Sequence, residues 1–191
     1  REHVFISQGA LTFNCSEILL PVREDESFVC CLSSYNLATY DQWEDPDDVV
    51  KTLIWFLDAV MEDFIDGAKD MEFMERPVKF ARRHRALGAG ALGWHSYLQK
   101  KGIPVESLEA MSANERIFSF LGESTKEASL ELGEMLGPNM VGSKQRNTTT
   151  MAIAPTKSSS FILGQVSPSI EPLQSNYYVQ DRAKIKHTYR N

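Results

Sequence analysis

The most regular hydrophobic pattern in the chain lies between residues 45 and 64. Asp45 is a good N-cap, and Pro46 suits the first position of a helix. Apolar residues then recur at helical spacing, namely Val50, Leu53, Ile54, Leu57, Val60, Met61 and Phe64. The pattern predicts an amphipathic helix that buries one face in a core.

Three further helices are indicated by caps and apolar spacing, at about 76–85, 94–101 and from a capping box at 112–115 onward. Gly102 ends the second of these, and Gly137 with Pro138 ends the third. The small residues of the run 86–93 allow very close backbone packing.

Strand patterns occupy the remaining ordered parts of the chain. Residues 27–37 are apolar on both faces, which predicts a strand covered on both sides. Residues 1–22 indicate a short extended segment with a loop, and 151–154 a short buried strand before a turn at Pro155. The tail from residue 165 is expected to be mostly irregular. Strands alternating with helices predict an α/β fold.

Composition narrows the classes of function. The 191 residues suffice for one domain with a sizeable core, and the net charge of −6 argues against a nucleic-acid partner. No apolar run approaches the roughly 20 residues of a membrane span, and no leader pattern is present, so no membrane partner is expected. Three cysteines, two of them adjacent, make a poor disulfide framework and suit the reducing cytoplasm.

Two cysteine-containing segments are candidate sites. Cys15 and Glu17 are two residues apart, so in an extended segment a thiol and a carboxylate project to the same side. By itself such a triplet is commonly a buried cysteine beside a chance glutamate. Cys30 and Cys31 are either two small hydrophobic residues in a buried strand, or one of them belongs to a redox pair whose partner lies elsewhere.

The hydroxyl-rich run from Thr156 to Ser160 is a candidate phosphate loop. Hydroxyls and successive backbone N–H groups after a strand can bind phosphate, and Lys157 adds a point charge. An ordinary hydroxyl-rich turn is the alternative. The basic run from Arg82 to Arg85 is expected to be a solvated helix end. The histidines lack metal-ligand spacing, so no metal site is predicted.

Taken in order, these motifs resemble the large (catalytic, alpha) subunit of class I ribonucleotide reductases over roughly residues 10–180. The matching segments are the asparagine–cysteine–glutamate group at 14–17, the cysteine strand at 29–37, the arginine-then-glycine run at 81–93, the phosphate loop at 152–160 and the stretch 164–175. Several motifs in the family's order are more specific than any one alone.

The resemblance implies a ten-stranded α/β barrel built from two half-barrels, with a finger loop at residues 10–21 threading its centre. Cys15 becomes a transient thiyl radical that removes hydrogen from the ribose 3′ carbon, and Glu17 accepts the proton of the 3′ hydroxyl. Cys30 is one of two thiols that reduce the 2′ position, and Cys31 has no redox role. The loop at 154–161, with Thr156, Lys157, Ser158, Ser159 and Ser160, binds the substrate's phosphates.

The chain departs from the family pattern in two respects. The family's asparagine lies two residues before the cysteine, where this chain has Phe13, and Asn14 is directly adjacent to Cys15. The second reducing cysteine and the tyrosine pair that relays the radical belong to segments upstream and downstream; Tyr177 and Tyr178 come too early for that relay. We therefore expect residues 1–191 to be a fragment of the catalytic barrel domain and no complete domain by itself.

The resemblance also implies partners. They are other fragments of the same subunit, a metal-containing small subunit that supplies the radical, the ribonucleotide substrate (a diphosphate), and thioredoxin or glutaredoxin as external reductant, with no cofactor bound by this chain. Two alternatives remain: a non-catalytic assembly or regulatory fragment, and a cysteine-nucleophile enzyme that uses His3 as base for Cys15.

Overall fold

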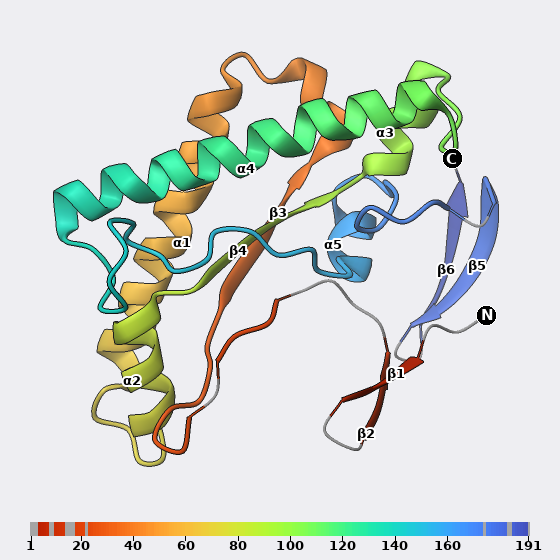
Figure 1. Cartoon of the computed structure of the whole chain (residues 1–191). Coiled ribbons are helices and arrows are strands. Elements are labelled where there is room, and N and C mark those ends of the chain that lie inside the picture. Colours follow the sequence, from red (N-terminus) through yellow and green to blue (C-terminus); the bar gives the residue numbers. More distant parts are fainter. Residues whose placement is uncertain are drawn as a thin grey trace.

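A computed structural model describes residues 4–7, 10–13, 18–21, 23–173, 175–182 and 185–190 (Figure 1). The elements in order are β1 (Val4–Ser7), β2 (Ala10–Phe13), β3 (Cys31–Asn36), the 3-10 helix η1 (Leu37–Gln42), α1 (Pro46–Ala68), α2 (Glu75–His84), β4 (Leu87–Leu92), α3 (Trp94–Lys101), α4 (Leu108–Leu136), α5 (Lys157–Ile162), β5 (Tyr177–Arg182) and β6 (Ile185–Arg190). The mixture of strands and helices agrees with the predicted α/β class.

Strand β4 is the centre of the structure. It pairs in parallel with β3, and Cys31 lies opposite Leu87 in the register. Its other edge bonds to the segment 149–152: the N–H groups of Leu87 and Ala89 donate to the carbonyls of Thr149 and Thr150 at 3.0 and 2.8 Å. All six residues of β4 are buried. The short strand predicted at 151–154 is reduced to a single bridge from Met151 to Ala89, and the backbone bonds to β4 come from residues 149–152.

The helices α1 and α4 form a layer that packs over the β3–β4 pair (Figure 1). Asp45 caps α1 as predicted, because its Oδ1 accepts the N–H of Asp48 at 3.1 Å. The inner face of α1 buries Val50, Ile54, Leu57, Met61 and Ile65. Full burial of such a side chain contributes about 1.5–3 kcal/mol relative to exposure. The predicted amphipathic helix is thus confirmed.

The start of α4 differs from the prediction. The helix begins at Leu108, and Ser107 is the cap, since its Oγ accepts the N–H of Ala110 at 3.1 Å. Ser112, expected to be the cap, lies one turn inside the helix. Helix-forming sequence follows both Ser107 and Ser112 within three residues, so the sequence is compatible with a helix start at either serine. The earlier one lengthens the buried face, which begins at Ala110.

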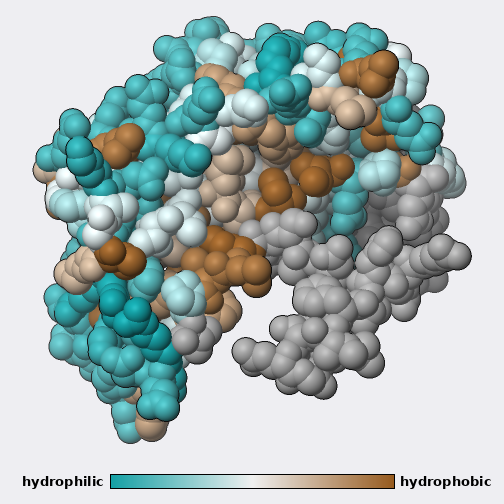
Figure 2. All heavy atoms as spheres, viewed as in Figure 1, coloured by the Kyte–Doolittle hydropathy of each residue, from teal (hydrophilic) through white to brown (hydrophobic). Residues whose placement is uncertain are grey.

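Two other expectations were wrong. The segment around β3 is not covered on both sides in the described part of the chain, because Phe28 is 57% exposed and Leu32 is 48% exposed. Figure 2 shows hydrophobic side chains gathered on the visible face near the centre of the molecule. The tail is not mostly irregular, because β5 and β6 pair as an antiparallel hairpin, as β1 and β2 do.

A buried ion-pair network lies before β4, centred on Arg85. Arg85 is 5% exposed and has a left-handed backbone with φ of 47°. Its Nε and one terminal nitrogen donate to the two carboxylate oxygens of Asp58, each at 2.9 Å, and the other terminal nitrogen donates to Glu62 at 2.6 Å. Asn147 joins the network by donating to Asp58 Oδ1 at 2.8 Å and to the Arg85 carbonyl at 3.0 Å.

This network corrects the expectation of a solvated basic helix end. Arg82 is exposed, but His84 and Arg85 are buried. The Arg85 side chain turns inward to α1, because the left-handed backbone ends α2 and redirects the chain into β4. A bidentate arginine–carboxylate pair compensates the burial of both charges.

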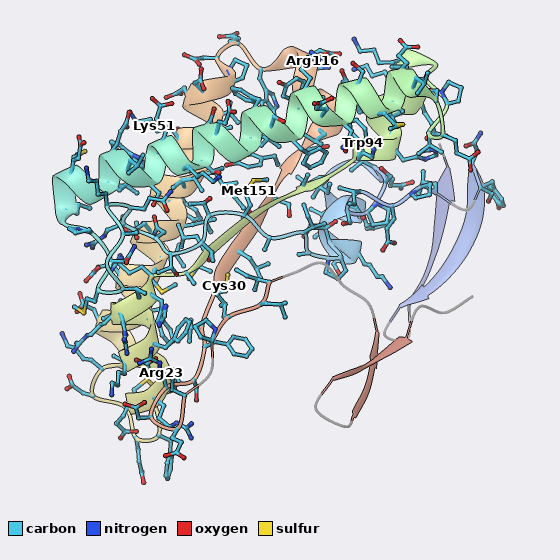
Figure 3. The ribbon with its side chains drawn as sticks, in the orientation of Figure 1. Arg23, Cys30, Lys51, Trp94, Arg116 and Met151 are labelled. Atoms are coloured by element: carbon cyan, nitrogen blue, oxygen red, sulfur yellow. The ribbon has the colours of Figure 1, made fainter. Side chains whose placement is uncertain are left out.

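A second group of polar contacts binds the segment before β3 to α2. Arg76 donates to the carbonyl of Arg23 at 3.2 Å, Lys79 pairs with Asp25, and Arg83 pairs with Glu26 at 3.1 Å. Figure 3 shows Arg23 near the α2 end of the strand pair and Cys30 further along it. These contacts fix the segment through which the chain enters β3, and so the approach to Cys30.

Glu26 and His84 form the buried part of this contact. Glu26 is fully buried, and its Oε2 lies 3.7 Å from Nε2 of His84, which stacks on Phe80. Burial lowers the pKa of His84. The nearby Glu26 carboxylate opposes this shift, and the positive charges of Arg83 and Arg23 add to it. His84 is therefore neutral near pH 7.

We expect Asp58→Asn to lower the free energy of unfolding by about 3–5 kcal/mol, because the buried Arg85 guanidinium loses its bidentate carboxylate and keeps only Glu62 as an ionic partner. The matched control is Asp66→Asn, which removes the exposed pair between Asp66 and Lys69 and should cost about 0.5 kcal/mol or less. Urea unfolding at one pH measures both. Equal losses in the two variants would contradict this account of the network.

We expect the chain to lose stability as the pH falls below about 6.5, the ordinary pKa of histidine. A group with a lowered pKa in the folded state binds its proton more readily when unfolded, so its stabilisation is present above 6.5 and is lost below it. His84→Phe keeps an aromatic ring against Phe80 and should flatten this dependence. Urea unfolding from pH 7.5 to 5.5 measures it, and an unchanged pH slope in the variant would contradict the assignment to His84.

Candidate functional site

The candidate site lies along one face of the β3–β4 pair. Cys30 is the residue before β3, and its neighbour Cys31 bonds through its N–H to the Ala86 carbonyl at 3.3 Å. Successive residues of an extended chain project to opposite sides. Cys31 accordingly packs against the hydrophobic core, while Cys30 points to the opposite face. Neither of the two adjacent cysteines forms a disulfide bond within the described residues, and their thiols lie in different environments.

Cys30 lies where β4 meets the segment that runs beside it. The position of a β-carbon at Gly88 lies 3.2 Å from Sγ of Cys30 and 2.7 Å from the β-carbon of Ala152. Cys30 and Ala152 are therefore neighbours across a glycine. In Figure 3, Cys30 and Met151 both lie along the strand pair. The run of small residues thus allows the close packing that the sequence predicted.

Cys31 is less suited to thiolate chemistry. Burial raises the pKa of its thiol, and the positive charge of Arg85 opposes that effect only in part. A thiol is a nucleophile as its thiolate, so the raised pKa lowers its reactivity at neutral pH. Its packing against the core and its raised pKa both argue against Cys31 as the reactive thiol.

The phosphate-loop candidate begins four residues after Ala152. Thr156 has a left-handed backbone with φ of 46° and lies directly before α5. Four extended residues span at most about 14 Å, so the loop lies within that reach of the Cys30 neighbourhood. The N–H groups in the first turn of a helix have no carbonyl partner within the helix. In α5 these include the N–H groups of Ser158 and Ser159, whose side chains are exposed.

Two of the five predicted loop residues hold the loop together. Oγ1 of Thr156 accepts the N–H of Ser169 at 2.7 Å, and the buried Ser160 donates its hydroxyl to the Lys157 carbonyl at 3.1 Å. The Ser160 N–H also donates to the Thr156 carbonyl at 2.8 Å. The hydroxyls of Thr156 and Ser160 are therefore structural supports in this conformation.

The loop is held against the start of α3 by contacts that the sequence did not suggest. Gly93 donates its N–H to the Ser167 carbonyl at 2.7 Å, and Ser96 and Ser167 exchange bonds between backbone N–H and hydroxyl at 3.1 and 2.8 Å. Gly93 has φ of 77°, and a β-carbon there would lie 2.8 Å from Oδ1 of Asn36. A glycine is needed at this position.

His95 belongs to the same support. Its Nδ1 accepts the N–H of Leu173 at 3.1 Å. Burial lowers the pKa of His95, which keeps the ring neutral and able to accept a hydrogen bond. The only sequence signal for these supports was the hydroxyl-rich composition of 156–169, which does not identify partners on α3.

Asn14, Cys15 and Glu17, the predicted radical cysteine and its neighbours, lie outside the residues that the structure describes. Their predicted roles stay predictions. Among the described residues, no group of three or more histidine, cysteine or acidic side chains is arranged to hold a metal ion. Within the same residues, no helix has the length and apolar character to cross a membrane.

Comparisons with known proteins give the family. The family model described as "Ribonucleotide reductase, barrel domain" matches residues 10–143. The ribonucleoside-diphosphate reductase large subunit of Invertebrate iridescent virus 3 is 43% identical over 169 residues, which is 87% of this chain and 26% of that protein. The vitamin B12-dependent ribonucleoside-diphosphate reductase of Thermoplasma acidophilum is 35% identical over 162 residues, covering 79% of this chain and 21% of that protein.

A solved structure agrees with the sequence comparisons. The class Id ribonucleotide reductase alpha subunit of Actinobacillus ureae superposes with a TM-score of 0.82 at 56% identity, over 86% of this chain and 32% of that one. The chain thus spans about a fifth to a third of the length of these relatives. The predicted resemblance and the predicted barrel class are confirmed. The chain belongs to the ribonucleotide reductase large-subunit family and corresponds to part of its barrel domain.

Proposed function

We propose that this chain forms part of the catalytic centre of a ribonucleoside-diphosphate reductase, which converts ribonucleotides to deoxyribonucleotides by thiyl-radical chemistry. It acts as one fragment of a split or processed catalytic subunit, and is active only when the missing parts of the barrel are present. The observation that carries the proposal is the placement of the Cys30 thiol beside Ala152, four residues before the phosphate-loop candidate.

The proposed chemistry balances with two thiols. Cys15, as a thiyl radical, removes the 3′ hydrogen atom of the ribose, and Glu17 takes the proton of the 3′ hydroxyl, with Asn14 beside them. The 2′ hydroxyl leaves as water with a proton from one of two thiols, Cys30 and a second cysteine outside this chain. The hydrogen of the other thiol goes to the 2′ carbon as the two sulfurs supply two electrons and become a disulfide. Glu17 then returns its proton to the 3′ oxygen, and the 3′ hydrogen atom returns from Cys15, which regenerates the thiyl radical.

Substrate binding divides between direct contacts and supports. We propose that the N–H groups and hydroxyls of Ser158 and Ser159, with Lys157, contact the substrate's phosphates. Thr156 and Ser160 act by holding the loop, as their bonds to Ser169 and Lys157 indicate. Backbone N–H groups at a helix start favour an anion in a chain that is acidic as a whole.

The proposed partners follow from this role. A protein named a large or alpha subunit has a smaller partner, and we propose a metal-containing small subunit as the source of the radical, with no cofactor bound by this chain. Thioredoxin or glutaredoxin would reduce the disulfide formed at Cys30, in the cytoplasm. The alternative of a cysteine-nucleophile enzyme, with His3 as base for Cys15, falls on residues outside those that the structure describes and stays an alternative.

We expect Cys30→Ser, in the assembled enzyme with thioredoxin as reductant, to lose at least about 1,000-fold in turnover, because a group that takes part in a covalent step is removed. Cys31→Ser is the matched control. It should keep turnover within about threefold, with a stability loss of about 1–3 kcal/mol for a half-buried hydroxyl on the core side. Chromatography of the deoxynucleotide product measures both. An active Cys30→Ser enzyme would refute the proposed role of Cys30.

We expect Thr156→Val to raise KM about tenfold with little change in kcat. Valine keeps the shape of threonine but leaves the Ser169 N–H without its acceptor, at a cost of about 1–3 kcal/mol. A loss of 1.4 kcal/mol in substrate binding corresponds to a tenfold change. Thr156→Ser retains the hydroxyl and is the control. Steady-state kinetics with a ribonucleoside diphosphate measure the split, and equal KM values in the two variants would argue against the support role.

A further inference from the structure

Gly88 occupies the contact between the candidate thiol and the segment that leads to the phosphate loop. A β-carbon at this position would lie 2.7 Å from the Ala152 β-carbon, 3.2 Å from Sγ of Cys30 and 3.4 Å from the Leu32 β-carbon. The first distance is shorter than real side chains adopt, the second is tight and the third is ordinary. Gly88 has no positive φ to require glycine, so the reason for glycine here is space.

The Sγ atom of Cys30 is the movable partner in this contact. It is the end of a side chain with one torsion, and the thiol donates to the Cys31 carbonyl at 3.7 Å. A β-carbon at Gly88 would displace Sγ by a few tenths of an ångström, or turn it to another staggered rotamer. Either change moves the thiol relative to Ala152 and to the segment 152–156.

The neighbouring glycine contributes differently. A β-carbon at Gly90 would collide with the carbonyl oxygen of Ala152, which is backbone and cannot rotate away. Gly90 therefore determines where the segment to the phosphate loop runs. A β-carbon at Gly88 would meet the Ala152 side chain instead, with Sγ of Cys30 as the second nearest atom, where for Gly90 the second nearest atom is the Ser34 hydroxyl.

We propose that Gly88 is a positioning residue for the Cys30 thiol, an inference that rests on the proposed function. Because Gly88 has no side chain, Sγ of Cys30 has the space to point toward the substrate's 2′ position. Transfer of a proton and electrons from a thiol requires close approach to the reacting carbon. A misplacement of about 1 Å at a reacting group costs on the order of 100-fold in rate. A shift of a few tenths of an ångström should therefore lower kcat by about tenfold.

The experiment separates the two contacts of Gly88 in the complete, assembled enzyme. Gly88→Ala adds the β-carbon. Gly88→Ala combined with Ala152→Gly removes the 2.7 Å contact with Ala152 but keeps the 3.2 Å contact with Cys30. Gly67→Ala is the matched control, because a β-carbon at Gly67 in α1 meets nothing within 4 Å. Steady-state kcat and KM, thermal midpoints and the rate of Cys30 alkylation by iodoacetamide in the reduced enzyme are measured for each.

We expect Gly88→Ala to lower kcat about tenfold, to raise KM and to lower the thermal midpoint. The added Ala152→Gly should restore KM and the midpoint, but not kcat or the alkylation rate, which should differ from that of the wild type. Gly67→Ala should match the wild type in kcat, KM and alkylation rate, and its thermal midpoint should not fall, because alanine favours the helix. If Gly88→Ala does not fold, the double variant is compared directly with Ala152→Gly alone.

Two results would overturn the inference. If Ala152→Gly restores kcat in the double variant, Gly88 acts through chain packing and not through Cys30. If the double variant keeps both the wild-type kcat and the wild-type alkylation rate, Gly88 does not position the thiol. Cys30→Ser, measured beside them, isolates the proposed function: an inactive Cys30→Ser with an unaffected double variant refutes the inference alone, and an active Cys30→Ser refutes the role of Cys30 itself.

Discussion

Strand β4 must accept neighbours on both edges and on both faces, and this constraint arranges the rest of the structure. β3 pairs along one edge and the segment 149–152 along the other, while α1 packs on the side of the core. Only small residues fit where the chain crosses close to the strand, as the contacts around Gly88 and Gly90 show. The two chemical elements of the candidate site, Cys30 and the phosphate loop, come from these two flanking segments.

The polar interactions protect that arrangement at both ends of β4. Before the strand, the Arg85–Asp58 pair and Asn147 join α1, the start of β4 and the segment that runs beside it. After the strand, Gly93 and Ser96 hold Ser167 and so the loop behind α5. Burying a charge without a partner costs free energy. The network therefore favours one alignment of these three segments relative to one another.

The sequence predicted those features that depend on neighbouring residues. Asp45 with Pro46 identified the start of α1, and Gly102 the end of α3, because caps act within one turn. The interactions it missed join residues distant in the chain: Arg85 meets an aspartate 27 positions earlier, and Asn147 bonds to a carbonyl 62 positions away. A basic run beside a helix end gives no sign of such partners, so Arg85 was expected in solvent.

The candidate site shows the same division between local and distant information. Once the strand is known, the alternation of side chains along it, a local rule, places Cys30 and Cys31 on opposite sides. The core lies on the side of Cys31, so Cys30 is the candidate for the chemistry. The run from Thr156 to Ser160 suggested five equivalent ligands by composition. In the structure Oγ1 of Thr156 accepts the N–H of Ser169, and the Ser160 hydroxyl donates to the Lys157 carbonyl, so these two hydroxyls support the loop. The proposed anion recognition then rests on the exposed serines, Lys157 and the backbone of the first helical turn. In this proposal Thr156 and Ser160 shape that surface without contacting the anion.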